Sequence, residues 1–335
     1  MKRFMKTHEF HVLVVVLILS AAITAVNPNF LTLENGFDLL KSYSFMGVLA
    51  IGILFVLISG GIDISFAATA TVAEYVMAVV SIKLGGNMIT SLLLATLVGL
   101  LLGAFNGFLI SKFKIAPIIT TIATMNFYYG ILTVITGGKW IYALPEWFRA
   151  FADIRVFTLV SRAGTPYGLS VITLFWAVIT VLAFFLLRYT MLGRGIYAIG
   201  GDIGSAERVG FPVRRLQIFV YSFMGMMAGI AGVIQALLVQ TVAPNSIVGK
   251  ELDVIAAVVL GGASLSGGFG SVGGTLLGVF LIAVVKNGMT LVKIPAVWYD
   301  VFIGAVILIS VGFTSWQGKK GYHQAVIDIE KEEAA

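Results

Sequence analysis

The stretch "FVLISGGIDISFAATATVAEYVMAVV", residues 55–80, decides the fold class, because most of it is as apolar as the interior of a lipid bilayer. It nevertheless holds two carboxylates, Asp63 and Glu74, and the pair Gly60-Gly61 precedes the first of them. A carboxylate near the middle of a membrane costs roughly 3 kcal/mol on insertion scales, so by default it faces a cavity or a partner. The stretch therefore predicts a broken, membrane-spanning region that carries polar side chains.

Apolar runs of this kind recur along the whole chain. Of the 335 residues, 59% are hydrophobic and 11% are charged, whereas about a quarter of the residues are charged in a soluble domain. Runs of about 17 to 25 apolar residues cross a bilayer as helices, and strand-type alternation is absent. We expect one all-α, polytopic transmembrane domain over residues 1–335 with about ten spans. They are residues 10–26, 43–60, 66–82, 90–111, 117–136, 168–187, 216–240, 253–266, 273–290 and 296–314.

The eighth of these spans differs from the others. "LDVIAAVVLGGASLSGG" has too few apolar residues before its glycines for a straight crossing, so we expect a broken or re-entrant segment near residues 253–272.

The sequence also contains a weak internal repeat. "VLISGGIDIS" (56–65) resembles "AVVLGGASLS" (257–266), and "NGFLISKFKIAP" (106–117) resembles "NGMTLVKIPA" (287–296). Transporters are often built from duplicated halves with the substrate path between them, although a match this short also arises by chance.

Basic residues predict the orientation of the chain. They cluster before the first span, in the loop 188–215, and after the last span, and Lys and Arg concentrate on cytoplasmic loops. With ten crossings, both termini and this loop are cytoplasmic. The basic N-terminus could also open a cleaved signal peptide, but its apolar run is long and many spans follow, so we expect a retained helix.

Several chemical classes are excluded. The chain has no cysteine, and its three histidines show no metal-binding pattern, so we expect no metal site and no catalytic residue. "GFGSVG" (268–273) matches GxGxxG, but it lies between spans rather than in a βαβ unit, and small residues that allow helices to pack explain it better. No P-loop occurs, so any ATP must bind another chain. The net charge of +6 lies mainly in loops and termini, which indicates membrane topology rather than nucleic-acid binding.

The loop "RYTMLGRGIYAIGGDIGSAERVGFPVRRLQ" (188–217) is the most informative part outside the spans. Glycines 200–201 break the chain, Asp202 or Ser205 can cap a short helix, and Gly210 can end it. A short capped helix on a basic loop is typical of an element that docks a partner. An ordinary connector stabilised by its own caps is the alternative.

Four motifs together resemble a known family. "GGIDIS", "NGFLISKFKIAPIITTIATMNFYYGI", "TMLGRGIYAIGGDIGSAERVGFPVRR" and "ELDVIAAVVLGGASLSGGFGSVGGTLLG" follow one another in the order found in membrane permeases of ribose- and galactose-type ABC importers. "ITGGKWIYALPEWF" (135–148) and "KIPAVWYDVFIGAVIL" (293–308) are similar to the rhamnose and autoinducer-2 branches. Relatives usually read GGIDLSVGS, whereas Phe66-Ala67-Ala68 stands here, which leaves the substrate open.

The resemblance implies a transport subunit in the bacterial cytoplasmic (inner) membrane that brings a monosaccharide or sugar-like solute into the cytoplasm. It implies a second permease chain, as a homo- or heterodimer, cytoplasmic ATPase subunits that bind ATP and Mg, and an extracytoplasmic solute-binding protein. No cofactor is expected in this chain. The loop 188–215 is then the cytoplasmic coupling loop. The ATPase contacts that carry over are Gly201, Asp202, Ala206, Glu207 and Gly210, and Arg208 joins them as a coupling candidate.

Polar residues within the spans are the candidates for the substrate path: Asp63, Glu74, Asn106, Asn126, Gln235 and Asn287. If residues 63–74 form one helix, Asp63 and Glu74 share a face roughly 16 Å apart. The alternatives are that Asp63 caps a helix and that the other side chains make hydrogen bonds between helices. The outer loop 137–167 is a candidate for docking the binding protein. A proton-coupled secondary carrier, in which the two carboxylates exchange protons, is the rival function.

Overall fold

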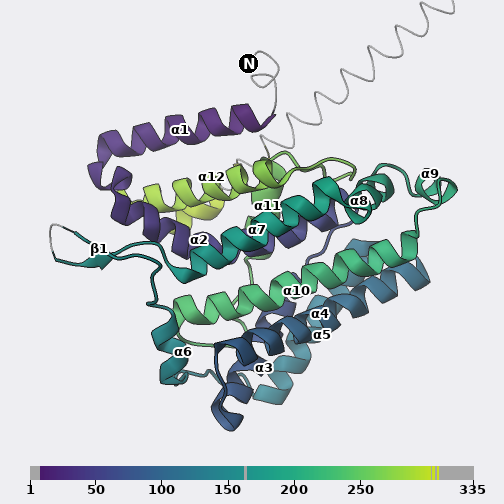
Figure 1. Cartoon of the computed structure of the whole chain (residues 1–335), viewed down its shortest axis with the longest axis horizontal. Coiled ribbons are helices and arrows are strands. Elements are labelled where there is room, and N and C mark those ends of the chain that lie inside the picture. Colours follow the sequence, from purple (N-terminus) through teal and green to yellow (C-terminus); the bar gives the residue numbers. More distant parts are fainter. Residues whose placement is uncertain (1–7, 162–163, 303, 306–307, 309–335) are drawn as a thin grey trace, which may run out of the picture.

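The computed structural model describes residues 8–161, 164–302, 304–305 and 308, and these are almost entirely helical (Figure 1). Eight helices are long and apolar enough to cross a membrane: α1 (His8–Val26), α2 (Leu33–Ile58), α3 (Phe66–Leu84), α4 (Met88–Phe113), α5 (Pro117–Thr136), α7 (Val171–Tyr189), α10 (Val213–Val239) and α12 (Val272–Leu291). The shorter elements are η2 (Pro28–Leu31), α6 (Glu146–Phe151), α8 (Met191–Gly201), α9 (Ile203–Arg208), α11 (Glu251–Leu260), β1 (Leu159–Val160) and β2 (Pro166–Tyr167). The predicted all-α polytopic class is confirmed.

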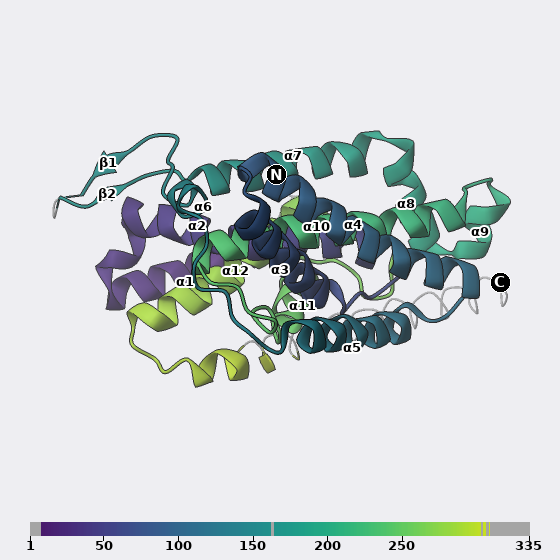
Figure 2. The ribbon, with the colours of Figure 1, turned by 90° about the horizontal axis from the view of Figure 1, so that it is seen from below.

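The long helices form a bundle with two distinct ends. Helices α8 and α9 lie at one end, and α6 with the antiparallel pair β1–β2 lies at the other, in both views (Figures 1 and 2). We call these the α9 end and the α6 end. Helix α2 runs through the centre, and every residue from Ser44 to Ile58 is buried. A helix that is apolar all round belongs in such a core.

Helices α4 and α10 pack with their backbones in direct contact. A Cβ atom added to Gly103 would lie 2.9 Å from Cα of Gly225, and one added to Gly99 would lie 2.9 Å from the backbone nitrogen of Gly229. Real Cβ atoms do not approach other atoms that closely. Because no hydrophobic force drives helices together inside lipid, close backbone packing through small residues is what holds such a pair.

Glycine-rich turns from three distant segments meet at the α9 end. The amide of Gly268 donates to the carbonyl of Ile58, with 2.9 Å between nitrogen and oxygen. A Cβ on Gly200 would lie 2.7 Å from the nitrogen of Gly268, and one on Gly267 would lie 2.7 Å from Cα of Gly60. The end of α2, the end of α8 and the turn before α12 therefore touch without space for side chains.

The two halves of the internal repeat share local turns. Gly60 follows the end of α2 with φ +82°, and Gly262 follows the end of α11 with φ +94°. In the second pair of motifs, Lys114 and Lys293 both have positive φ just beyond a helix. The similarity in sequence thus reflects similar helix endings, and an arrangement of whole duplicated halves stays a prediction.

The eighth predicted span is broken. Helix α11 has 10 residues, and at 1.5 Å per residue it covers about 15 Å, half of a hydrocarbon core of about 30 Å. Before it, Val242 pairs with Ile141 near the α6 end, through N–O distances of 2.8 and 3.0 Å. The chain reaches the α9 end only by combining the stretch 240–250 with α11. The expectation of a broken segment is confirmed, although its helix ends at Leu260 rather than at residue 266.

Some expectations concern residues outside the described part of the chain. Only the first residues of the predicted span 296–314 are described, and they are helical from residue 297. The basic residues before the first span and after the last one lie outside the described residues as well. The N-terminal part of α1 is at the α9 end, where the His8 ring nitrogen is 3.0 Å from the carbonyl of Leu260.

Candidate functional site

Asp63 belongs to a buried hydrogen-bond network just before α3. Its Oδ1 accepts from both the backbone nitrogen and the hydroxyl of Ser65, each at 2.7 Å. Asn106 of α4 donates to the same hydroxyl oxygen at 2.7 Å, and Tyr128 of α5 donates to Oδ1 of Asn106 at 3.4 Å. The carboxylate thus satisfies the backbone where α3 begins and links three helices. The N-cap of α3 is Ser65, so Asp63 closes a turn just before the helix rather than capping the helix itself, as our alternative had it.

Residues 63–74 do not form one helix, because α3 begins at Phe66. The calculation that places Asp63 and Glu74 on one helical face is therefore wrong. The turn between α2 and α3 is tightly packed, because a Cβ on Gly61 would collide with the hydroxyl of Tyr221 from α10. Asp63 therefore lies in this turn, whereas Glu74 lies within α3.

Glu74 lies in the core between α3, α10 and the stretch before α11. Its side chain is fully buried, and Oε2 accepts from the hydroxyl of Ser246 at 3.2 Å. The other oxygen, Oε1, is buried without a hydrogen-bond partner among the described residues. Gly232 of α10 lies against it, since a Cβ there would be 3.2 Å from the Cβ of Glu74. A buried carboxyl oxygen without a partner is costly, so it marks a place where another group can bind.

Further polar groups gather beside Glu74. Thr71, one turn earlier on α3, and Glu251, the first residue of α11, are both close to the hydroxyl of Tyr129 from α5. Glu251 is only 7% exposed. We call Thr71, Glu74, Tyr129, Ser246 and Glu251 the Glu74 cluster. It supplies hydroxyl and carboxyl oxygens, which are suitable partners for the hydroxyl groups of a polar solute.

The structure does not bring the other candidate path residues together. Asn287 of α12 and Asn35 of α2 exchange two hydrogen bonds, of 3.0 and 3.1 Å, which join these helices. Asn126 is exposed on α5 and donates to the carbonyl of Ile122 at 2.9 Å. Gln235 on α10 is half-buried, one turn beyond Gly232. Of these three amides, Asn287 takes the alternative of a hydrogen bond between helices, Asn126 bonds within its own helix, and Gln235 lies on the helix that faces Glu74.

An ion pair that sequence reasoning missed joins α11 to α12. Lys286 donates to Oδ2 of Asp253, and their side chains are 17% and 11% exposed. The charges are 33 positions apart in sequence, on two helices that the glycine turn 261–271 folds against each other. The sequence could have predicted this ion pair, because the broken span contains an acidic residue, the next span contains a lysine, and charges buried in a membrane pair with one another.

The loop 188–215 contains the predicted short helix. Asp202 accepts from the backbone nitrogen of Ser205 at 2.7 Å and begins α9, and Gly210, with φ +93°, follows its end. Hydrogen bonds from Ser205, together with the charge of Arg208, hold the pKa of Asp202 below its usual value. Ala206 is buried, whereas the rest of α9 is exposed.

The exposed side of α9 projects from the bundle beside a cavity. Glu207 and Arg208 are exposed, as are the apolar Ile203 and Val209, which are 47% and 78% exposed. A cavity of about 510 Å³ separates α9 from the glycine turn 59–61 and from the turn between α4 and α5. An exposed mixture of apolar and charged side chains on a capped helix is suited to a protein partner.

Comparisons with known proteins identify the family. The family described as branched-chain amino acid transport system, permease component, matches residues 35–311. The chain is 31% identical to the ribose import permease protein RbsC of Escherichia coli K12, over 89% of this chain and 90% of that protein. It is 32% identical to RbsC of Haemophilus influenzae, over 92% and 93% of the two chains.

The autoinducer 2 import system permease protein LsrC of Photorhabdus luminescens is also 32% identical, over 92% of this chain and 90% of LsrC. No solved structure matches significantly. These relatives confirm the resemblance to ribose-type permeases that the four motifs indicate and the similarity to the autoinducer-2 branch that residues 135–148 and 293–308 indicate. The match extends over most of the chain and includes the Glu74 cluster and α9. The chain therefore belongs to this family of transport-system permease components.

Proposed function

We propose that this chain is the membrane-spanning subunit of a bacterial ATP-driven importer for a monosaccharide or sugar-like solute. It would act in the inner membrane, with both termini cytoplasmic, together with a second permease chain, ATPase subunits and a solute-binding protein. ATP and Mg would bind only to the ATPases. The relatives named for import of ribose and of autoinducer 2 support the class of solute.

The single observation that carries the proposal is the form of α9. This short helix has a side-chain cap at its start, one buried residue, Ala206, that packs against the bundle, and exposed charges at Glu207 and Arg208. The preceding helix α8 carries Gly200 in its last turn, and this glycine has no free space against Ile58 and Gly268. A displacement of α9 by closing ATPases is therefore transmitted by contact to α2 and α12.

The Glu74 cluster is the proposed solute contact. Oε1 of Glu74 has an unused acceptor site, and the neighbouring Ser246 lies in the broken segment rather than in a rigid helix. Movement of α11 would expose the cluster on one side of the membrane. A sugar hydroxyl could then donate to Glu74. We retain Gln235 as a second polar group of this path, whereas Asp63 and Asn106 maintain the turn before α3.

The experiment is uptake of radiolabelled ribose, as the probe solute, into liposomes that contain the permease, its ATPase subunits and its binding protein. We expect the double variant Glu207→Ala/Arg208→Ala to lose ATP-driven uptake and ATPase binding while remaining folded. The matched control is Glu146→Ala/Arg149→Ala on α6, which removes the same two charge types at the opposite end. This control should keep full ATPase binding.

Unchanged uptake in the α9 variant would refute the coupling role. Uptake by the permease alone, without ATPases and abolished by a protonophore, would refute the ATP-driven mechanism and favour a proton-coupled carrier. The solute contact is tested separately with Glu74→Gln, which keeps the size of the side chain. We expect it to reduce uptake without affecting ATPase binding, and uptake equal to that of the wild type would remove Glu74 from the path.

A further inference from the structure

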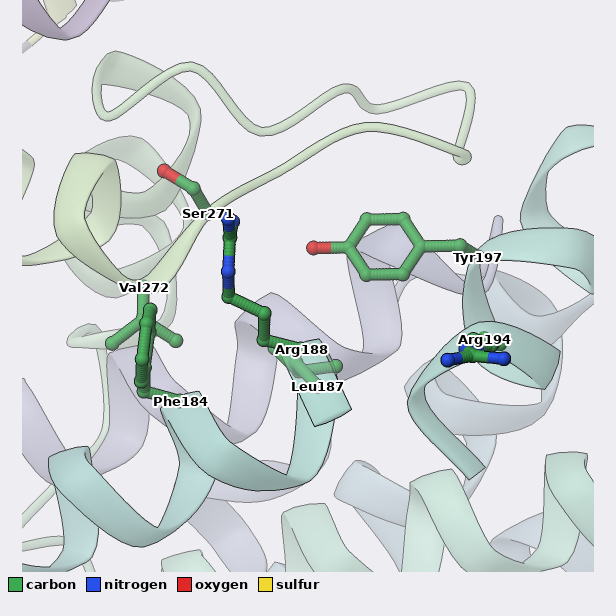
Figure 3. A pocket seen from close by; sticks show the side chains of 7 residues that line it. All are labelled: Phe184, Leu187, Arg188, Arg194, Tyr197, Ser271 and Val272. Carbon is green, nitrogen blue, oxygen red and sulfur yellow. The ribbon is translucent and has the colours of Figure 1, made fainter. Parts of the chain in front are cut away.

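A second pocket lies near the α9 end of the bundle (Figure 3). It has a volume of about 450 Å³ and lies between the end of α7, the start of α8 and the start of α12. The residues that line it are Phe184, Leu187, Arg188, Arg194, Tyr197, Ser271 and Val272. Neither the coupling role nor the solute path uses this pocket.

Two arginines give the pocket its charge. Arg188 reaches toward Ser271, and the ring of Tyr197 lies between Arg188 and Arg194 (Figure 3). Within the part of the chain that the structure describes, no carboxylate lies within 4.0 Å of either guanidinium group, since the ion pairs found there involve other residues. The neighbouring Glu9 accepts a hydrogen bond from Ser271 instead. Among the described residues neither arginine is therefore in an ion pair, and the carboxylate at this wall, Glu9, is bound by Ser271.

The groups around the arginines also favour an anion. Tyr197 donates its hydroxyl proton to the carbonyl of Gly270 at 2.7 Å, so this side chain is held in place as part of the wall. Helix α12 begins at Val272, and its 20 residues direct the positive end of the helix dipole toward the pocket. The hydroxyl of Ser271 caps the amide of Gly274, so the first amides of α12 stay available.

The apolar part of the wall indicates where the anion comes from. Phe184, Leu187 and Val272 belong to the membrane-spanning helices α7 and α12. Next to them, the rings of Phe184, Phe185 and Tyr189 pack against one another with centroids 5.5 to 6.2 Å apart, and all three are exposed. Aromatic residues at the end of a span are typical of the interface between lipid and water.

Helix α8 continues this surface. Met191 and Leu192 at its start are 65% and 42% exposed, one turn from Arg194. Exposed apolar side chains next to arginines, directly after a span, fit a helix that lies in the headgroup region. A water-soluble anion or an acidic protein surface would not need this apolar wall. A lipid would use both parts, because its phosphate can pair with the arginines while its acyl chains follow α7.

We propose that this pocket binds the headgroup of an anionic phospholipid, whose negative charge the guanidinium groups of Arg188 and Arg194 attract. The bound lipid would brace α8 against α7 and α12. Since Gly200, in the last turn of α8, touches α2 and the turn before α12, the lipid would stabilise the element that carries α9. Binding itself does not depend on the importer function, so it is testable with the permease alone.

The test measures binding of a fluorescent phosphatidylglycerol to the purified full-length permease in detergent. An arginine near an anionic surface contributes about 5-fold in affinity, so Arg188→Gln/Arg194→Gln should weaken binding about 30-fold. The matched control is Arg214→Gln/Arg215→Gln at the start of α10, which removes the same charge at the same end. We expect its affinity to stay within 3-fold of the wild type.

Competition identifies the source of the anion. Unlabelled phosphatidylglycerol should displace the probe, whereas phosphatidylcholine and inorganic phosphate at equal concentration should not. Equal weakening in both double variants would mean diffuse attraction and would overturn the proposal. Displacement by inorganic phosphate alone would replace the lipid with a soluble anion. Loss of ATPase binding by the Arg188→Gln/Arg194→Gln variant in lipid-free detergent would assign the arginines to a protein interface instead.

Discussion

The contact between α4 and α10 supports a sharp prediction about the variant Gly103→Ala. The added Cβ would lie 2.9 Å from Cα of Gly225 and 3.0 Å from its nitrogen, and closer still to the carbonyl oxygen of Tyr221. All three atoms belong to the backbone of α10, so no side chain can rotate away. The carbonyl oxygen of Tyr221 would be only 2.2 Å away, and real Cβ atoms essentially never come within 3.0 Å of another atom, so the helices must separate by at least about 0.8 Å (3.0 minus 2.2).

The energetic cost follows from this separation. A gap of 0.5 to 1 Å forfeits about a quarter to a half of each dispersion contact along the crossing, and overpacking of this kind costs about 1 to 3 kcal/mol. Replacing glycine by alanine in a helix gains about 1 kcal/mol of helix propensity. We therefore expect a net destabilisation of about 1 to 2 kcal/mol. The separation would also disturb Asn106, one turn further along α4, which donates to Ser65.

The assay is the thermal unfolding midpoint of purified protein in one detergent, followed by its size-exclusion profile. At about 2 °C per kcal/mol for a chain of this size, Gly103→Ala should lower the midpoint by about 2 to 4 °C. The matched control is Gly130→Ala on α5, where a Cβ meets nothing within 4 Å. This variant should keep or raise the midpoint. Equal midpoints for the two variants would refute the argument that backbone contact holds α4 against α10.

Two further predictions concern charges. Asp253→Asn alone or Lys286→Met alone should destabilise the protein by about 3 to 5 kcal/mol, because each leaves the other charge buried without a partner. The measurement is the yield of monodisperse purified protein. Exchanging the two residues, so that the pair is reversed, should restore part of that yield. The pKa of Asp202 lies below 3.8, so its cap on α9 should be complete above about pH 4 and weaken as the pH falls through that lower value. Hydrogen exchange of the Ser205 amide at different pH values measures the strength of this cap. The variant Asp202→Asn should keep the cap but lose its dependence on pH. If exchange in that variant still followed the wild-type pH dependence, Asp202 would not be the titrating group.

The sequence alone determined the features that depend on neighbouring residues. The apolar runs predict the helices because crossing a bilayer requires a certain length and hydropathy. The glycines and Asp202 predict the boundaries of α9, since caps and turns act within a few residues. The short apolar stretch before Gly261 predicts the broken segment for the same reason. Glu74 was also recognised as unusual, because a single buried carboxylate is rare in such a span.

Only the tertiary structure decided which distant groups meet. Asp63 and Glu74 were candidates for one face of a single helix, but Asp63 lies in the turn before α3, where it accepts hydrogen bonds from Ser65. Glu74 meets Ser246, 172 positions away, and the arginine pocket forms only where α7, α8 and α12 converge. Hydropathy gives the length of each helix but neither its rotation nor its neighbours. Those depend on close packing over the whole bundle, in which the glycine contacts of α4 and α10 fix how near the helices lie.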